Sequence, residues 1–261
     1  MGWAWRIALL VGMLALGTWA LLGRINREID PVMVDRLCPP RTAAEAEKPV
    51  AGDTYALCRY RADNARLLAS GEPVRTVFLG DSITDWWRDD DPGLFQSGLV
   101  NRGIAGQASD ELLLRFRQDV IALRPRVVHL QTGTNDIAGN TGRTDPDAFL
   151  ANVESMIDLA RANGIEPVIA SLPAIDRIPH QRHAEATQRA IDLNRRLAAL
   201  AGRRGVVFAD YHAVLAGADG KPRPGLTTDG LHPSPAGYAA MRTVLDRALA
   251  QAESRAAKGP R

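Results

Sequence analysis

The feature that most constrains the fold is an alternation of short apolar runs with longer amphipathic stretches over residues 53–253. Strands are expected at the apolar runs, residues 76–80, 99–101, 126–133, 166–172 and 205–210. Helices are expected at residues 53–70, 109–124, 145–164, 183–205 and 234–253. Because the strands are apolar throughout and alternate with helices, we predict an α/β domain whose parallel sheet is covered on both faces.

Composition is consistent with one folded domain of this kind. The chain has 261 residues, of which 46% are apolar, and this is enough to bury a single sizeable core. Charged residues make up 24% and the net charge is +2, with the basic residues scattered along the sequence. Neither disorder nor a nucleic-acid-binding surface is therefore expected.

The N-terminus carries an uncharged run of 17 residues, 7–23, between Arg6 and Arg24. At about 1.5 Å per residue, the run is just long enough to span a thin hydrocarbon core. Residues 1–24 are thus either an uncleaved signal anchor or a cleaved signal peptide. We favour the anchor, because signal peptides have apolar regions of roughly 7–15 residues and a small-residue cleavage site. The domain is then expected in the periplasm, tethered to the inner membrane, with secretion after cleavage as the alternative.

The chain has only two cysteines, Cys38 and Cys58, both placed between the apolar run and the first expected strand. In an oxidising compartment, such a pair favours a disulfide, and two unrelated thiols are the alternative. Residues 25–52 are rich in proline and polar side chains and indicate a linker. Residues 254–261 are expected to form a disordered tail.

Polar side chains follow several of the expected strands, at the edge where open α/β sheets bind ligands. Ser82 follows the first strand, Gly106 lies in a glycine-containing loop after the second, and Asn135 follows the third. Asp229 and His232 lie three residues apart in a longer loop after the fifth. Each residue has a commoner structural role when taken alone; a serine after a strand, for example, usually caps the next helix.

Together these residues supply what acyl transfer requires. A serine hydroxyl is a weak nucleophile and needs a base within hydrogen-bonding reach, which His232 can provide for Ser82. Asp229 can accept the Nδ1–H of that imidazole and leave Nε2 facing the serine. The N–H groups of Ser82 and Gly106 and the side-chain amide of Asn135 are candidate donors to an oxyanion.

Three further residues are weaker candidates for binding substrate. Trp86 could line an acyl or sugar groove, although packing on a helix face is equally compatible with its position. Arg177 and His180 lie in the loop of residues 173–183 after the fourth strand, which should border the site. The acidic run at residues 89–91 indicates a solvated turn, and no metal-binding motif is present.

Four segments of the sequence resemble the blocks of the SGNH/GDSL hydrolase family. They are GDSIT at residues 80–84, NRGIAGQAS at 101–109, GTNDI at 133–137 and DGLHPS at 229–234. The resemblance runs from about Val74 to Leu249 and makes residues 53–253 the hydrolase domain. It implies a flavodoxin-like three-layer sandwich with a five-stranded parallel sheet, and neither a metal nor an organic cofactor.

The resemblance also implies roles for the residues in these blocks. Ser82 would be the nucleophile, Asp229 and His232 the rest of a catalytic triad, and Gly106 and Asn135 oxyanion donors. The family includes lipases, lysophospholipases, enzymes similar to platelet-activating-factor acetylhydrolase, and carbohydrate acetylesterases. We therefore expect a serine esterase acting on acyl or acetyl esters of lipids or carbohydrates. The alternatives are an acyltransferase partner in envelope polysaccharide modification and a catalytically silent glycan-binding module.

Overall fold

The structure is a computed structural model that describes residues 38–40, 42, 45, 48–142, 145–178 and 185–258. The expected membrane segment at residues 7–23 and the candidate His180 lie outside these residues. Within the described part of the chain, none of the helices combines the length and the apolar character needed to cross a bilayer. The chain divides into two compact units, Met1–Pro39 and Pro40–Arg261, and the second contains the sheet. Cys38 and Cys58 are both disulfide-bonded.

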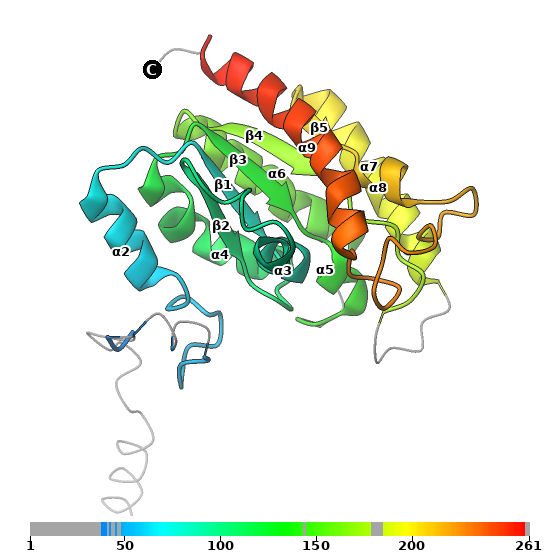
Figure 1. The fold of residues 1–261 in the computed structure, drawn as a ribbon, viewed down its shortest axis with the longest axis horizontal. Helices are drawn as coiled ribbons and strands as arrows, with labels where there is room; N and C mark the ends of the chain where they lie inside the picture. The colour runs from blue at the N-terminus through cyan, green and yellow to red at the C-terminus, as the bar shows by residue number, and fades with distance from the viewer. Residues whose placement is uncertain are drawn as a thin grey trace, which may run out of the picture. The chain divides into compact units, whose positions relative to one another are not determined.

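The second unit contains a sheet of five parallel strands, as the sequence predicts (Figure 1). The strands are β1 (Thr76–Gly80), β2 (Leu99–Gly103), β3 (Val127–Gln131), β4 (Glu166–Ala170) and β5 (Val207–Ala209). Their order in the sheet is β2-β1-β3-β4-β5, and all neighbouring pairs run parallel. This is the flavodoxin-like order.

The strand order reverses beside β1, which pairs with β2 on one edge and with β3 on the other. Gly80 at the end of β1 is level with Gly103 of β2 and with Gln131 of β3. The loops after these three strands therefore leave the sheet at the same height. Such a switch point is where open α/β sheets bind their ligands.

Helices cover both faces of the sheet and complete a three-layer sandwich (Figure 1). One face packs against α4 (Ser109–Asp119), α6 (Pro146–Ala162) and α7 (Ala186–Arg204). The other packs against α3 (Ser82–Asp90), α8 (Tyr211–Leu215) and α9 (Pro235–Ala256). Alternate residues of each strand enter opposite cores, as β1 shows: Val77 and Leu79 face the first group of helices, and Phe78 faces the second.

Several helix boundaries differ from those expected. The helix predicted at residues 53–70 begins only at Arg61, as α2 (Arg61–Ser70), because the Asp53 carboxylate accepts the N–H groups of Leu57 and Cys58 and folds this stretch into turns. The helix predicted at 109–124 ends at Asp119 and is followed by the 3-10 helix η2 (Ile121–Leu123). Arg124, the residue before Pro125, is left-handed and ends this second turn, consistent with the restriction that proline places on the residue before it. Helix α9 continues to Ala256, past its expected end at residue 253.

Helix α3 is capped by Asp81 and not by Ser82. One carboxylate oxygen of Asp81 accepts the Ile83 N–H at 3.0 Å. The side chain is completely buried, and its other oxygen has no hydrogen-bond partner among the described residues. Burial, together with the nearby carboxylates of Asp136 and Asp85, raises the pKa of Asp81 from 3.8 to about 7, although the bond from Ile83 opposes the shift. A buried carboxyl group that titrates near neutral pH therefore begins this helix.

This titration predicts how stability depends on pH. The folded state holds the Asp81 proton more tightly than an unfolded chain does, so the stability that this group contributes is lost as pH rises from about 4 to about 7. Asp81→Asn removes the titration. We expect the difference in unfolding free energy, variant minus wild type, to become more positive across this window, with a slope of up to about 1.4 kcal/mol per pH unit. Urea unfolding at a series of pH values measures it, and a pH-independent difference would contradict the prediction.

The end of β2 lies unusually close to the first turn of α3. A Cβ atom added at Gly103 would lie 2.2 Å from the backbone nitrogen of Asp85. We expect Gly103→Ala to lower the free energy of unfolding by about 1–3 kcal/mol, because strand and helix must separate to admit the methyl group. Gly202, inside α7, is the matched control, since no atom lies within 4 Å of a Cβ added there. Gly202→Ala should raise the unfolding free energy by about 0.5–1 kcal/mol; equal losses for both variants would refute the close approach.

Candidate active site

Ser82 is the first residue of α3 and lies at the carboxyl end of β1. Because Asp81 caps the helix, the Ser82 hydroxyl is not needed for that purpose. Its Oγ lies 3.1 Å from Nε2 of His232, which comes from a distant loop after α8. The side chain is only 6% exposed, so this contact is largely shielded from solvent. The structure thus brings the candidate nucleophile within hydrogen-bonding distance of the candidate base.

The other ring nitrogen of His232 contacts Asp229. Nδ1 lies 2.7 Å from Oδ2 of the Asp229 carboxylate. With a proton on Nδ1 donated to that carboxylate, Nε2 presents its lone pair to the Ser82 hydroxyl. Hydroxyl, imidazole and carboxylate therefore form one continuous hydrogen-bonded chain.

The turn at residues 229–232 explains how Asp229 and His232, only three residues apart, can contact each other. Oδ1 of Asp229 accepts the backbone N–H groups of Leu231 at 3.0 Å and His232 at 2.8 Å. Gly230 directly follows Asp229 and has φ of +91°, a left-handed conformation that favours glycine. The turn thus fixes the carboxylate on the side of the histidine ring.

Hydrogen bonding also keeps Asp229 ionised. Burial alone would raise the pKa of Asp229, but the His232 N–H, the His232 ring and the Leu231 N–H outweigh it and lower the pKa below its ordinary value. The group is therefore a carboxylate at neutral pH, able to hold the ring in one tautomer and to stabilise an imidazolium.

Arg177, a candidate for substrate binding, packs against this turn. Its Nε donates to the Asp229 carbonyl oxygen at 2.7 Å, and the N–H of the preceding Asp176 donates to the Gly230 carbonyl at 2.8 Å. A Cβ added at Gly230 would lie 2.9 Å from Cγ of Arg177. The observed contacts of Arg177 thus support the backbone that carries Asp229.

The two tryptophans of α3 have different environments. Trp87 is 1% exposed and packs against the rings of Tyr211 and Tyr238 in the core. Trp86 is 41% exposed, and its ring centroid lies 4.4 Å from that of His232. Trp86 also lines a cavity of about 490 Å³. The other residues of its wall include Val50, Ala56, Asp85, Ile104 and Ala105. Of the two, Trp86 is therefore the one placed to touch a ligand at the site.

The two remaining site candidates, Gly106 and Asn135, lie together. Gly106 has φ of +86° in the loop after β2, and Asn135 lies in the short helix α5 (Thr134–Ala138) after β3. Nδ2 of Asn135 donates to the Gln107 carbonyl at 2.9 Å. The amide of Asn140 bridges both, donating to Oδ1 of Asn135 and to the Gly106 carbonyl at 2.9 Å each. Because an amide NH₂ has two hydrogens, Asn135 keeps one donor beyond its bond to the loop.

Sequence reasoning does not identify several residues that contact the backbone of the site segments. Asn140 has no distinctive motif, and the supporting role of Arg177 depends on contact with a turn distant in sequence. Arg115 could have been found from sequence, because it is a charged residue between Leu112 and Phe116 on the buried face of α4. Among the described residues, no group of three or more His, Cys, Asp or Glu side chains could hold a metal ion.

Comparison with curated proteins finds a partial match. The chain is 33% identical over 82 residues to YqeF, an uncharacterized lipoprotein of Bacillus subtilis. The match covers 30% of this chain and only 34% of the lipoprotein, about a third of its length.

Comparison with solved structures finds similar folds over most of the domain. A GDSL-like lipase from Bacteroides thetaiotaomicron has a TM-score of 0.71 at 36% identity, with 76% of this chain and 98% of that one covered. A proposed acylhydrolase from Bacteroides fragilis has a TM-score of 0.71 at 38% identity, with the same coverage of both chains. A family model matches residues 78–240, more than half of the chain, and it describes GDSL-like lipases and acylhydrolases. The chain therefore belongs to the GDSL-like lipase/acylhydrolase family.

Proposed function

We propose that the protein is a serine hydrolase of carboxylic esters, with Ser82 as nucleophile, His232 as general base and Asp229 as the group that orients it. The observation that supports this most strongly is the hydrogen-bonded chain of these three residues at the sheet's switch point, with distances of 3.1 Å and 2.7 Å. Family membership supports the reaction class.

In the proposed acylation step, Oγ of Ser82 attacks the ester carbonyl carbon while Nε2 of His232 takes the hydroxyl proton. The resulting imidazolium is stabilised by the Asp229 carboxylate. As the tetrahedral intermediate collapses, the bond to the alcohol oxygen breaks and His232 returns the proton to that oxygen. The acyl group remains on Ser82 as an ester.

Deacylation repeats these steps with water. His232 takes a proton from a water molecule, whose oxygen attacks the acyl carbon, and then protonates Oγ of Ser82 as the acid leaves. In both steps, negative charge develops on the carbonyl oxygen. We assign its stabilisation to the N–H groups of Ser82 and Gly106 and to the second amide hydrogen of Asn135. One such donor is worth about 10²–10³ in kcat in other hydrolases.

Trp86 and the cavity beside it suggest where the rest of the substrate binds. The cavity, about 490 Å³, is within the usual size of small-molecule pockets of about 300–1,000 Å³. Besides apolar groups, its wall includes Arg59, Asp85, Arg88 and Asp89. An exposed aromatic ring flanked by side chains that donate and accept hydrogen bonds suits an acylated sugar or the polar part of an acylated lipid. We propose an ester of one of these two kinds.

We further propose that the domain works outside the cytoplasm, held at the membrane through residues 7–23, or released after cleavage. The lipoprotein relative in Bacillus subtilis is compatible with an envelope location. Transfer of the acyl group to a sugar hydroxyl would use the same acyl-enzyme with a different acceptor. A catalytically silent glycan-binding module would use none of this chemistry.

Ester hydrolysis tests the proposal. We expect the full-length protein to hydrolyse p-nitrophenyl esters, and Ser82→Ala to lower kcat by about four orders of magnitude or more, because it removes the nucleophile. A series from acetate to palmitate would measure the acyl length that the site accepts. Ser155→Ala, at an exposed position on α6, is the matched control and should retain full activity. Equal rates for wild type and Ser82→Ala would refute the assignment, and glycan binding without hydrolysis would favour the silent module.

The role of Trp86 can be tested separately. We expect Trp86→Ala to raise KM about tenfold for a preferred ester, equivalent to about 1.4 kcal/mol of lost binding. Leu114→Ala, at another exposed apolar position, should leave KM unchanged. Steady-state kinetics on both variants gives the comparison, and an unchanged KM for Trp86→Ala would place the substrate elsewhere.

A further inference from the structure

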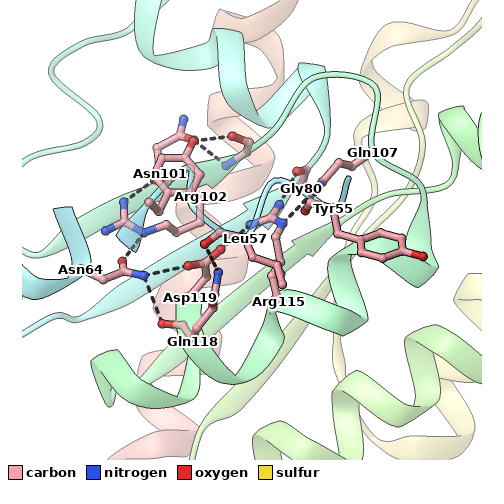
Figure 2. A network of polar contacts seen from close by, with 12 residues as sticks. Tyr55, Leu57, Asn64, Gly80, Asn101, Arg102, Gln107, Arg115, Gln118 and Asp119 are labelled. Carbon is pink, nitrogen blue, oxygen red and sulfur yellow. Dashed lines mark hydrogen bonds and ion pairs between the residues drawn. The ribbon is translucent and has the colours of Figure 1, made fainter. Parts of the chain in front are cut away.

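Arg115 of α4 is completely buried, with 0% of its side chain exposed. Its guanidinium donates to three fixed acceptors, as Figure 2 shows. Nε donates to Oε1 of Gln107 at 2.6 Å, Nη1 to Oδ2 of Asp119 at 3.1 Å, and Nη2 to the Gly80 carbonyl at 3.1 Å. One planar group thus links α4 to the end of β1 and to the loop after β2.

Two of these three acceptors lie next to residues of the candidate active site. Gly80 comes two residues before Ser82, and Gln107 directly follows Gly106. The Gln107 carbonyl also accepts Nδ2 of Asn135. The Gly80 carbonyl in turn accepts the Ile104 N–H at 3.0 Å. Arg115 therefore links the end of β1, two residues before Ser82, to the loop after β2 that contains Gly106.

Burying this charge is costly, and the ion pair with Asp119 does not by itself compensate for the cost. Removing an ion from water is unfavourable, and a buried ion pair often contributes no net stability compared with apolar residues. A flat guanidinium is, however, well suited to hold several acceptors in one fixed geometry. Such a geometry matters most where donors must be preorganised for a transition state.

We propose that Arg115 is a positioning residue, which sets the oxyanion donors at the right distance from Ser82. The inference rests on the proposed esterase function. Arg115 does not contact the substrate; it acts through Gln107 and the Gly80 carbonyl.

The same polar network includes residues 55–64, the segment before the first strand (Figure 2). Nε2 of Gln107 donates to the Tyr55 carbonyl at 3.0 Å, and Nε2 of Gln118 donates to the Leu57 carbonyl at 2.8 Å. Asn64 donates to Asp119 at 2.7 Å. These supporting groups lie in residues 55–64, upstream of residues 78–240 that match the family model. The support for the oxyanion loop therefore includes a segment outside the matched family region.

A second buried arginine of the same network provides a matched control. Arg102, 2% exposed, donates to Asn64 and Asp63 at 2.8 Å and to the Asn101 carbonyl at 2.7 Å. These acceptors lie in α2 and β2. Replacing Arg102 disturbs a buried arginine and the same upstream segment, but removes no bond to Gly80 or Gln107.

The test compares Arg115→Lys with Arg102→Lys in the full-length protein. Lysine keeps a positive charge near Asp119 but cannot hold three acceptors in a plane. For Arg115→Lys, we expect kcat on the preferred p-nitrophenyl ester to fall about 10- to 100-fold, with KM close to that of the wild type. Inhibition by phenylboronic acid, whose adduct with Ser82 places an anionic oxygen among the oxyanion donors, should weaken by the same factor. Arg102→Lys should lower Tm and leave kcat and boronate affinity unchanged.

The possible outcomes separate this proposal from the one on which it rests. Absence of Ser82-dependent hydrolysis in the wild type overturns the esterase assignment and the role of Arg115 with it. An active wild type with a folded Arg115→Lys variant of unchanged kcat overturns the positioning role alone, as does an equal loss of kcat in Arg102→Lys. If Arg115→Lys does not fold, Gln107→Leu replaces it, since it removes the Arg115 and Tyr55 bonds but keeps the carbonyl that Asn135 contacts. Unchanged kcat in that variant also overturns the positioning role.

Discussion

The candidate site depends first on the register of the sheet. Because Gly80, Gly103 and Gln131 end three neighbouring strands at one level, the loops that follow them meet at the switch point between β1 and β3. Short segments after the strands are therefore enough to place Ser82, Gly106 and Asn135 at the same edge of the sheet. Only Asp229 and His232 arrive from a distant loop, and their own turn holds them as a unit. A rigid sheet and one preformed turn thus account for the arrangement.

At the start of α3, helix capping and the candidate nucleophile belong to two neighbouring residues. Asp81 caps α3, which leaves the Ser82 hydroxyl available to His232. The arrangement places a fully buried carboxyl group, with one oxygen lacking a partner among the described residues, directly before the nucleophile. Arg115 likewise places a buried charge beside the Gly80 carbonyl. Two costly burials thus lie next to the residues assigned to the chemistry.

The strands and the polar residues that follow them could be predicted from sequence, because each depends on a local sequence pattern. Apolar runs such as residues 76–80 determine the strands, and the four short blocks place their polar residues at strand ends. The turns of residues 53–60 could not be predicted, because the Asp53 side chain replaces helical hydrogen bonds there. The contacts of Arg177 and Arg115 join segments far apart in the chain, and sequence periodicity does not reveal such contacts. For Trp86 the sequence is compatible with two roles, and its exposure and its contact with the His232 ring favour the one at the site.

The central claim is that Ser82 carries the acyl group between two half-reactions. Mass spectrometry of the protein quenched in acid during turnover of p-nitrophenyl acetate, followed by peptide mapping, tests it most directly. We expect one acetyl group per chain, located on the peptide that contains Ser82, which accumulates on mixing and disappears once the substrate is exhausted. Continued turnover with an unmodified Ser82 peptide, or with the acetyl group on another residue, would contradict the account.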